Sequence, residues 1–450
     1  MRITSILASV LCANSLVLAD DTATILKPPT APLDARVVKE KVTELELPQM
    51  ASVIVQPPPA IHRIAESAAN VPCSEKTYTD ARRAIDLALT RMRATQDVSG
   101  GWMVKKAAAG TDQPQPSMAA STAVSALALK AFAQAGATPA SDEAAKKALA
   151  MIRQQVRGGD GFFNPDPNGG LGNYVASAVV SGLAAVDDAS DRPLIEEAIE
   201  WLTKTQWDQS EGISPAMDWF GGSGYGKWGR PDLSNTQMML DALHDAQVSA
   251  DDPAVQRALV FLTRTQNLPA TNSVAWVEAG SKDGGFIYTP ANGGESFASD
   301  AAGEGRYGEK MPAGQPRSLR SYGSMTYAGF KSLLYAGLTK DDPRVQAAFN
   351  WIRRHWTFSE NPGLGQQGYF YFIHAMARAL HASGHESVVD GKGVSHAWRD
   401  ELVATLVARQ RADGSWINET SRWEEGDVDL CTVYCVLALE EAIKPTKTTP

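Results

Sequence analysis

Carboxyl groups at several points of the sequence are candidates for acid–base chemistry. In the stretch Asp232-Leu233-Ser234-Asn235-Thr236, a carboxyl, a hydroxyl and an amide stand together at the start of an expected helix. We single out Asp232 as the candidate catalytic residue. Because Asp, Ser and Asn are also preferred helix N-caps, capping is the competing interpretation.

Two stretches rich in glycine and aromatic residues, 217–232 and 267–316, hold further carboxyls at Asp218, Asp283, Glu295 and Glu304. With Asp232, these residues would supply the acid and the base that glycoside hydrolysis requires, although the sequence gives no distance between them. Both stretches lead into an expected helix, so we place them at one end of the fold. Because long ordered loops are often functional, this end is the candidate ligand face.

Aromatic residues near these carboxyls predict the lining of a ligand cavity. Tyr369 to Phe372 and His374 open one expected helix, and aromatic faces stabilise cations or stack on sugars. Packing against neighbouring helices is the alternative role for such a run. The residues that we expect at the ligand are Trp219, Trp228, Ser234, Tyr322, Tyr327, Tyr369, Tyr371 and His374.

A recurring sequence motif, called the phrase below, indicates the helices that must position these residues. Each copy is the end of an amphipathic helix followed by a glycine turn and an aromatic residue, and the fullest copies run from Gln96 to Trp102 and from Gln410 to Trp416. Four further copies lie around Val156, Gln206, Gln266 and Trp356. We expect the Gln to bond backbone groups at the turn and the aromatic residue to pack back on the helix end.

A second helix follows each phrase, and these helices also align. Each carries an anchor residue, a Leu seven places later and a small residue just before that Leu. The pairs are Thr122/Leu129, Ala176/Leu183, Thr236/Leu243, Thr326/Leu333, Ile373/Leu380 and Thr432/Leu439. Seven residues make two helical turns, so anchor and Leu share one face. Six helix pairs must stack to bury these faces, and the pattern alone allows an open superhelix or a closed ring.

Length and composition fit one large domain with an extension. Residues 1–19 resemble a secretory signal peptide, 20–77 form a proline-rich linker, 78–444 the repeat domain and 445–450 a tail. We therefore expect an exported protein that is periplasmic, attached to the cell envelope or secreted. The apolar run of the signal is too short for a comfortable membrane span. The net charge of −9 and the scattered basic residues argue against a nucleic-acid partner.

Three cysteines remain after removal of the signal: Cys73, Cys431 and Cys435. In an exported protein they invite a disulfide, and one turn of helix between Cys431 and Cys435 is an awkward geometry for a bond between these two. The hypothesis is a bridge from Cys73 to one of them, and the alternative is three buried thiols.

The phrase of a helix end, a Gln, a short spacer and Asp-Gly-Ser-Trp resembles the repeat of the squalene cyclase and protein prenyltransferase superfamily. The resemblance covers about residues 80–444. It implies an all-α fold, the α/α toroid, in which six inner and six outer helices form a closed ring. The stretches 232–236 and 321–329 also resemble a group of exported bacterial proteins of this superfamily that have no established activity.

The resemblance implies specific catalytic positions, and the sequence departs from them. Cyclases of the superfamily carry Asp-x-Asp-Asp-Thr-Ala, in which the middle Asp protonates an alkene. The counterpart here is 232–237, which keeps the first Asp and the Thr but has Ser234 at the acid position. A second counterpart, 322–327, has no carboxyl. Because an alkene is a very weak base, a hydroxyl does not replace the acid.

Prenyltransferases of the superfamily bind zinc through Asp-x-Cys and a later His, which Asp429 and Cys431 resemble in part. No aligned His follows, and His374 is about one turn out of register. An N-cap Asp and a core Cys are the alternative, and we expect no metal and no other cofactor.

The sequence thus predicts an exported, cyclase-like toroid that binds a small apolar or isoprenoid ligand without the usual acid. The alternatives are an active isoprenoid cyclase or transferase and a glycan-active enzyme. A deep apolar cavity with one desolvated carboxylate would favour an enzyme. A shallow, filled or wholly polar cavity would favour a binding module whose protein partner the sequence does not identify.

Overall fold

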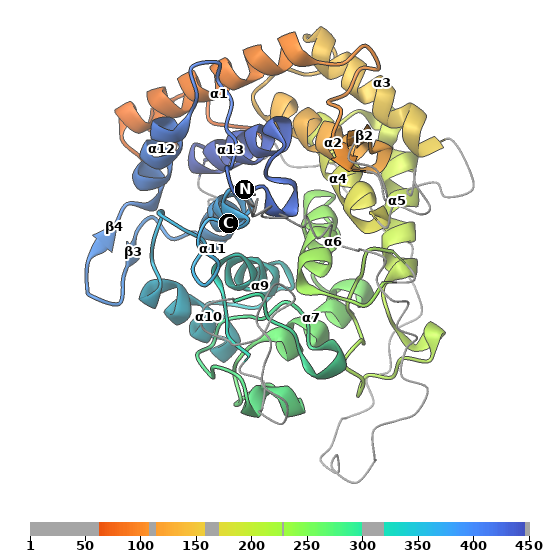
Figure 1. The fold of residues 1–450 in the computed structure, drawn as a ribbon, viewed down its shortest axis with the longest axis vertical. Coiled ribbons are helices and arrows are strands. Elements are labelled where there is room, and N and C mark those ends of the chain that lie inside the picture. The colour runs from red at the N-terminus through yellow and green to blue at the C-terminus, as the bar shows by residue number, and fades with distance from the viewer. Residues whose placement is uncertain (1–62, 108–113, 158–170, 227–228, 299–318, 446–450) are drawn as a thin grey trace, which may run out of the picture.

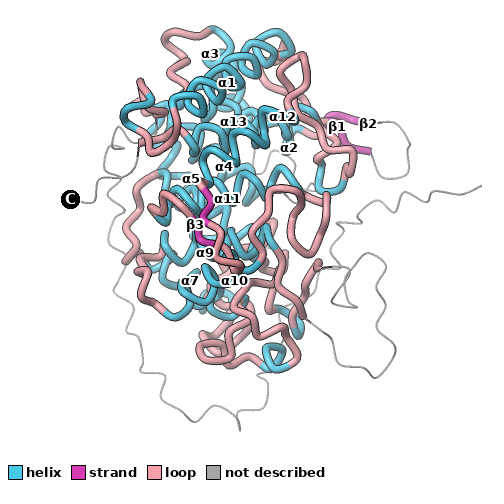
Figure 2. Tube along the Cα trace, turned by 90° about the vertical axis from the view of Figure 1, so that its left-hand side faces the viewer, coloured by secondary structure: helices cyan, strands magenta, loops and turns pink. Residues whose placement is uncertain are grey.

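The computed structural model describes residues 63–107, 114–157, 171–226, 229–298 and 319–445. The predicted signal peptide, most of the predicted linker and residues 446–450 lie outside the described residues. The described chain is all-α apart from two short antiparallel strand pairs, β1 (Lys105–Ala107) with β2 (Pro114–Pro116) and β3 (Val388–Val389) with β4 (Ser395–His396). β1 and β2 lie at the edge of the helices in Figure 2, and β3 and β4 lie at their edge in Figure 1.

Twelve α-helices of the described chain form two concentric rings (Figure 1). The inner helices are α2 (Met118–Gln134), α4 (Gly172–Val186), α6 (Leu233–Asp245), α9 (Gly323–Tyr335), α11 (Tyr369–Ser383) and α13 (Val428–Ala442). The outer helices are α1 (Glu75–Thr95), α3 (Glu143–Arg157), α5 (Arg192–Thr205), α7 (Pro253–Thr265), α10 (Pro343–Arg354) and α12 (Trp398–Arg409). Each inner helix packs against the next, and α13 packs against α2. The ring is therefore closed, and the expected α/α toroid of six helix pairs is confirmed.

Short 3-10 helices occur in the connections around this ring. They are η2 (Ala68–Asn70), η3 (Ala189–Asp191), η4 (Gln209–Glu211), η5 (Ala275–Glu278), η6 (Ala291–Gly293) and η7 (Arg422–Glu424).

The repeated Gln residues tie neighbouring outer helices together. At the C-cap of α5, the side chain of Gln206 donates to the carbonyl oxygens of Gly221 at 2.8 Å and of Ala254, in the next outer helix, at 2.9 Å. The side chain of Gln410 donates to the carbonyl oxygen of Ala84 in α1, also at 2.9 Å. The last outer helix is thus bonded to the first, so this repeated residue also closes the outer ring.

In the last repeat, the aromatic residue and the anchor act as a pair. Trp416 is fully buried, and its indole N–H donates to the carbonyl oxygen of Leu406 at 2.8 Å. Its backbone N–H donates to the hydroxyl of Thr432, the anchor of α13, at 3.3 Å. Gly414 has φ +89°, and a Cβ there would lie 2.7 Å from the carbonyl oxygen of Leu87. These contacts explain why the turn needs glycine and why the anchor is often Thr.

The segment before α1 packs against the ring. Ile64 and Ala65 are buried, and the N–H of Ala65 donates to the carbonyl oxygen of Ile443 at 3.1 Å. Because α1 begins at Glu75, the ring starts inside the predicted linker 20–77. None of the helices in the described ranges has the length and hydropathy that crossing a bilayer requires.

The hypothesised disulfide does not form in this structure, where Cys73, Cys431 and Cys435 are free thiols. Cys73 lies near Arg399, whose guanidinium donates to the carbonyl oxygen of Ala442 at the C-terminal end of α13. Cys431 lies in the first turn of that helix, about 16 Å away along its axis. Disulfide geometry requires Cα atoms within about 7 Å of each other.

Candidate functional site

A cavity of about 220 Å³ lies inside the ring at the N-terminal ends of the inner helices. All six inner helices or their N-caps contribute to its wall. The lining residues are Val104, Ala120, Ala123, Val124, Leu127, Leu171, Tyr174, Ala178, Tyr225, Ser234, Met238, Tyr288, Phe297, Tyr322, Ser324, Met325, Gly368, Tyr371, Trp423, Glu424, Leu430 and Tyr434. Aliphatic and aromatic side chains dominate this set, as they do in sites for small apolar ligands.

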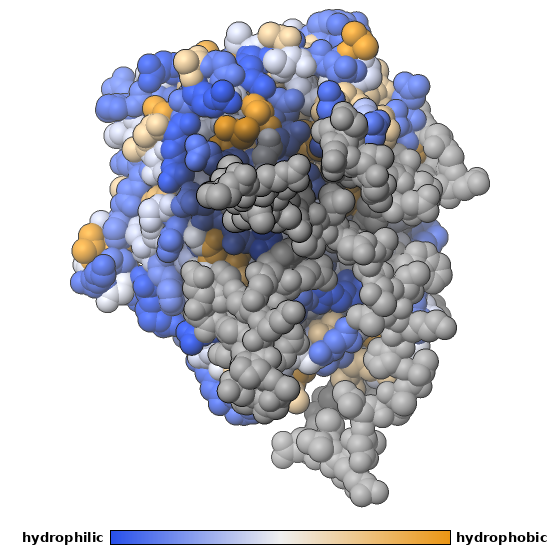
Figure 3. Space-filling view, viewed as in Figure 1, coloured by the Kyte–Doolittle hydropathy of each residue, from blue (hydrophilic) through white to orange (hydrophobic). Residues whose placement is uncertain are grey.

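Loops from both predicted stretches reach this cavity. Tyr225 comes from the first stretch, and Tyr288 and Phe297, with ring centres 4.5 Å apart, come from the second. A third loop adds Trp423, which is 38% exposed, and Glu424. These last two residues have φ of 55° and 65°, a region that side chains other than glycine seldom adopt. On the face viewed in Figure 1, the described outer surface is mainly hydrophilic (Figure 3).

Three hydroxyl groups meet at one point of the cavity wall. The hydroxyl of Ser234 lies 2.6 Å from that of Tyr174 and 3.3 Å from that of Tyr371. The amide nitrogen of Gln237 donates to the Tyr371 hydroxyl at 3.0 Å, and the amide oxygen of Gln237 accepts from the ammonium of Lys331 at 2.7 Å. A chain of hydrogen bonds therefore links the cavity to the interior of the ring.

Ion pairs between the inner helices occupy that interior. Lys331 lies 2.6 Å from a carboxylate oxygen of Asp241, and Lys130 lies 2.5 Å from one of Asp245. Arg378 donates to Asp245 at 2.9 Å. All five side chains are buried, and burial lowers the pKa of Lys331 to about 8, although Asp241 opposes this shift. Lys331 therefore stays largely protonated at neutral pH.

Asp232 lies behind the cavity wall. Its two carboxylate oxygens accept from the backbone N–H and the side-chain amide of Asn235, each at 2.8 Å, so it caps α6. Burial raises the pKa of Asp232 to about 6, although bonds from Asn235 and from the Tyr288 hydroxyl lower it. The Tyr288 hydroxyl lies 3.3 Å from that of Tyr225. Two cavity-lining tyrosines thus connect the cavity with this carboxylate.

Glu425 is a second buried carboxylate near the cavity. One of its oxygens accepts from the N–H of Tyr371 at 2.7 Å, and the other accepts from the amide of Asn418 at 2.6 Å. Glu425 therefore caps the N-terminal end of α11, because the N-cap residue Gly368 has no side chain that could accept a hydrogen bond. Burial raises the pKa of Glu425 to about 7 despite these bonds.

Three of the sequence-predicted ligand residues line the cavity, namely Ser234, Tyr322 and Tyr371. His374 does not, because it lies one turn further along α11, with its ring stacked on Tyr434 at 5.4 Å. The candidate catalytic residue, Asp232, reaches the cavity only through Tyr288.

The other predicted ligand residues lie elsewhere. Trp219 packs edge-on against Trp207 at 4.9 Å in a separate small core. Tyr327 packs on Phe372. The Tyr369 hydroxyl donates to the carbonyl oxygen of Phe358 at 2.6 Å, beneath the guanidinium of an α12 residue. Successive residues of a helix point in different directions, so a run of aromatics cannot line one cavity. Trp228 lies outside the described residues.

The weak metal candidates have other partners. Asp429 forms an ion pair with Arg91 at 2.6 Å, and the Cys431 thiol donates to the carbonyl oxygen of Glu425 at 3.1 Å. In the part of the chain that the structure describes, no three His, Cys, Asp or Glu side chains group as metal ligands.

The carboxylates proposed for glycan chemistry do not meet at the cavity. Asp283 accepts from the Ser321 hydroxyl at 2.7 Å and from the indole of Trp351 at 3.0 Å. Glu295 forms an ion pair with Arg230. Asp218 is absent from the lining set, and Glu304 lies outside the described residues.

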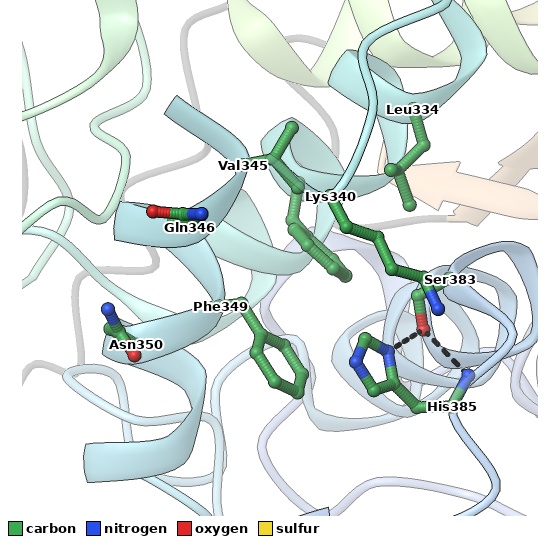
Figure 4. A pocket seen from close by; sticks show the side chains of 9 residues that line it. Leu334, Lys340, Val345, Gln346, Phe349, Asn350, Ser383 and His385 are labelled. Atoms are coloured by element: carbon green, nitrogen blue, oxygen red, sulfur yellow. Dashed lines mark hydrogen bonds between the residues drawn. The ribbon is translucent and has the colours of Figure 1, made fainter. Parts of the chain in front are cut away.

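A second cavity of about 210 Å³ lies between α9, α10 and the end of α11 (Figure 4). It is lined by Phe330, Leu334, Lys340, Val345, Gln346, Phe349, Asn350, Ser383 and His385. His385 stacks on Phe349 at 4.3 Å and lies 2.9 Å from the Ser383 hydroxyl. None of the predicted ligand residues lines it, so the central cavity is the candidate site.

The repeat contains a signal for the cavity wall that our sequence analysis missed. The residue two places before each anchor lines the cavity in all six inner helices: Ala120, Tyr174, Ser234, Ser324, Tyr371 and Leu430. Tyr174 and Leu430 follow from this rule. Loop residues such as Tyr288 and Trp423 have no comparable signal.

The closed double ring around an axial cavity defines an α/α toroid. The sequence matches no protein-family profile and no curated protein. Among solved structures, the chain is similar to the type II terpene cyclase MstE from Scytonema, with a TM-score of 0.47 and 13% identity over 81% of this chain and 98% of that chain.

A variant of MstE in complex with geranylgeranyl dihydroxybenzoate, its substrate, gives a TM-score of 0.46 and 13% identity over 82% of this chain and 99% of that chain. A protein from Actinoplanes gives a TM-score of 0.29 and 16% identity over 80% of this chain and 99% of that chain.

Proposed function

We propose that the cavity binds a small, largely apolar ligand of isoprenoid type and that the protein does not cyclise it by protonation. The observation that carries this proposal is the ring of residues two places before the anchors. It contains hydroxyl and apolar side chains from all six inner helices but no carboxyl. Ser234, at the position of the acid that the sequence resemblance implies, is hydrogen-bonded to Tyr174 and Tyr371 instead.

The cavity wall supports an apolar ligand. The apolar lining of the cavity includes Val124, Leu127, Met238, Met325 and Leu430. Its volume of about 220 Å³ is below the roughly 300–1,000 Å³ of most ligand pockets. A short isoprenoid chain therefore suits it better than a chain of the length of squalene.

Asp232 does not suit alkene protonation. Its pKa of about 6 leaves it ionised at neutral pH, and its two oxygens already accept from Asn235. Protonation of an alkene needs a strong acid that points at the substrate. Here Tyr288 stands between the carboxylate and the cavity.

The second candidate function is an enzyme that uses Asp232 through Tyr288. The observation in its favour is the desolvated carboxylate one hydrogen bond behind the cavity wall. Such a pair would act as a weak acid or base near pH 6, because that is where Asp232 changes its charge.

Equilibrium dialysis with labelled farnesol, followed by gas chromatography of the recovered lipid, tests both candidates. We expect saturable binding and unchanged farnesol. Ala123→Trp, which fills the cavity, should abolish binding, whereas Ala150→Trp on the exposed face of α3 should not. Absence of saturable binding, or equal binding by both variants, would overturn the proposal. A product that Asp232→Asn abolishes would establish the second candidate.

We also propose that the protein is exported, which the signal-like residues 1–19 support. N-terminal sequencing of the protein from its own cells tests this. A mature N-terminus close to Asp20 is the expected result, and a chain that still begins with Met1 would contradict export.

A further inference from the structure

The hydrogen-bond chain at the cavity has a fixed direction. An ammonium group can only donate, so the side-chain oxygen of Gln237 must face Lys331, at 2.7 Å. The amide nitrogen of Gln237 then faces Tyr371 and donates to its hydroxyl at 3.0 Å. Lys331 is a positioning residue here, because its charge sets the orientation of a neutral amide.

Among the described residues, this direction leaves one hydrogen atom without an acceptor. The hydroxyls of Tyr174, Ser234 and Tyr371 carry three hydrogens and are joined by two hydroxyl–hydroxyl bonds. Each bond uses one hydrogen, whichever group donates. Gln237 brings its own hydrogen to Tyr371, so the third hydroxyl hydrogen remains available at the cavity.

The neighbouring part of the wall, where the ring of Tyr225 lies 5.8 Å from that of Tyr174, has the reverse arrangement. There the Tyr288 hydroxyl is bonded to the carboxylate of Asp232, which only accepts when ionised, and the Tyr225 hydroxyl lies 3.3 Å from that of Tyr288. The carboxylate draws the Tyr288 hydrogen away from the cavity. The surplus donor is therefore a property of the wall around Ser234.

We infer that this group of three hydroxyls binds an uncharged oxygen acceptor, such as a carbonyl or ether oxygen, at the head of the apolar ligand. This inference rests on the proposed function and specifies its ligand class. Ser234 is buried, and Tyr174 and Tyr371 are half-buried. A ligand that fills the cavity excludes water from these hydroxyls, and a donor without a partner would then be unfavourable. A ligand oxygen bonded to this group of hydroxyls removes that penalty. The head lies between Tyr174 and Tyr371, and the tail extends along the apolar wall.

The charges around this point argue against an anionic head. Lys331 is separated from the cavity by Gln237 and is already paired with Asp241, while Arg378 and Lys130 pair with Asp245. A carboxylate or phosphate on the ligand would lose its water and find no available cation among these groups. A neutral acceptor has no such penalty.

The test compares two probes of equal length: the ketone geranylacetone and the hydrocarbon in which a methylene replaces its carbonyl. We expect the ketone to bind the wild-type protein about tenfold more tightly, as one hydrogen bond would give. Gln237→Glu should abolish this preference, because an ionised carboxylate accepts the Tyr371 hydrogen and leaves no surplus. Gln237→Met should retain it, because that side chain does not take the hydrogen.

The outcomes separate this inference from the proposed function. If both probes bind the wild-type protein equally, the inference is wrong and the apolar cavity stands. If neither probe binds, the proposed function fails as well. A ketone preference that persists in Gln237→Glu also contradicts the inference.

A measurement on the unmodified protein covers the case in which the variants do not fold. The infrared carbonyl stretch of bound geranylacetone should lie below its frequency in a hydrocarbon solvent. An unshifted band would show that no hydrogen bond forms.

Discussion

The pH dependence of stability should report the buried carboxylate of Glu425. In the folded protein its oxygens accept from the N–H of Tyr371 and from the side chain of Asn418, and burial raises its pKa from 4.5 to about 7. Between these two pH values the folded state binds more protons than the unfolded state. The free energy of unfolding should therefore decrease as the pH rises through this window.

The size of the effect follows from the same two values. An interval of about 2.5 pH units corresponds to about 3 kcal/mol. This stabilisation is fully present below about pH 4.5 and is lost as the pH rises through 7. Asp232 changes in the same direction at lower pH, because burial raises its pKa from 3.8 to about 6. A variant is needed to separate the two carboxylates.

Glu425→Gln keeps the shape of the side chain and removes its titration. Urea unfolding at pH 5 and pH 8 should show that the wild-type protein loses about 2.5 kcal/mol more than this variant over that interval, because part of the effect lies outside it. Glu419→Gln, which neutralises an exposed carboxylate on the same loop, controls for net charge and should behave like the wild type. Parallel pH dependence in the wild type and Glu425→Gln would refute the reasoning.

Three further substitutions test the ring and its interior. Gln410→Ala removes two hydrogen bonds, including the bond to Ala84 that joins the last outer helix to the first, and should cost about 1–3 kcal/mol in urea unfolding; an unchanged midpoint would contradict this role. Lys331→Met leaves the Asp241 carboxylate without its closest cation and should cost about 3–5 kcal/mol, whereas a smaller loss would mean that Arg378 compensates. Gly182→Ala places a Cβ about 2.6 Å from a carbonyl oxygen of α2 and should lower the melting temperature in calorimetry, and a stable variant would show that the two helices separate easily.

The helix pairs could be predicted because the sequence is periodic. Each anchor and its Leu lie on one helix face, and each Gln serves a turn in its own repeat, so local patterns predicted the helix pairs. The alignment of the six inner helices on their anchors also contained the information that Tyr174 and Ser234 line the cavity, because both stand two places before their anchors. Our reading of the aromatic run 369–372 as one lining missed this rule, and only Tyr371 of that run faces the cavity.

The rest of the site depends on contacts between distant segments. Glu425 stands 54 residues after Tyr371, whose N–H it accepts, and no local pattern links the two. Tyr288 reaches Asp232 from a different loop. Lys331 and Asp241, charged residues on largely apolar helices, were visible in the sequence, but their pairing required the closed ring to bring α6 and α9 together.

Native mass spectrometry of the protein purified from the organism that encodes it tests the central claim most directly. The account predicts a retained, uncharged molecule of short isoprenoid size in the wild-type protein, with its carbon chain still open. Ala123→Trp should carry none of it, because that side chain fills the cavity. A wild-type protein that consistently emerges without a ligand, or with a cyclised product, would contradict the account.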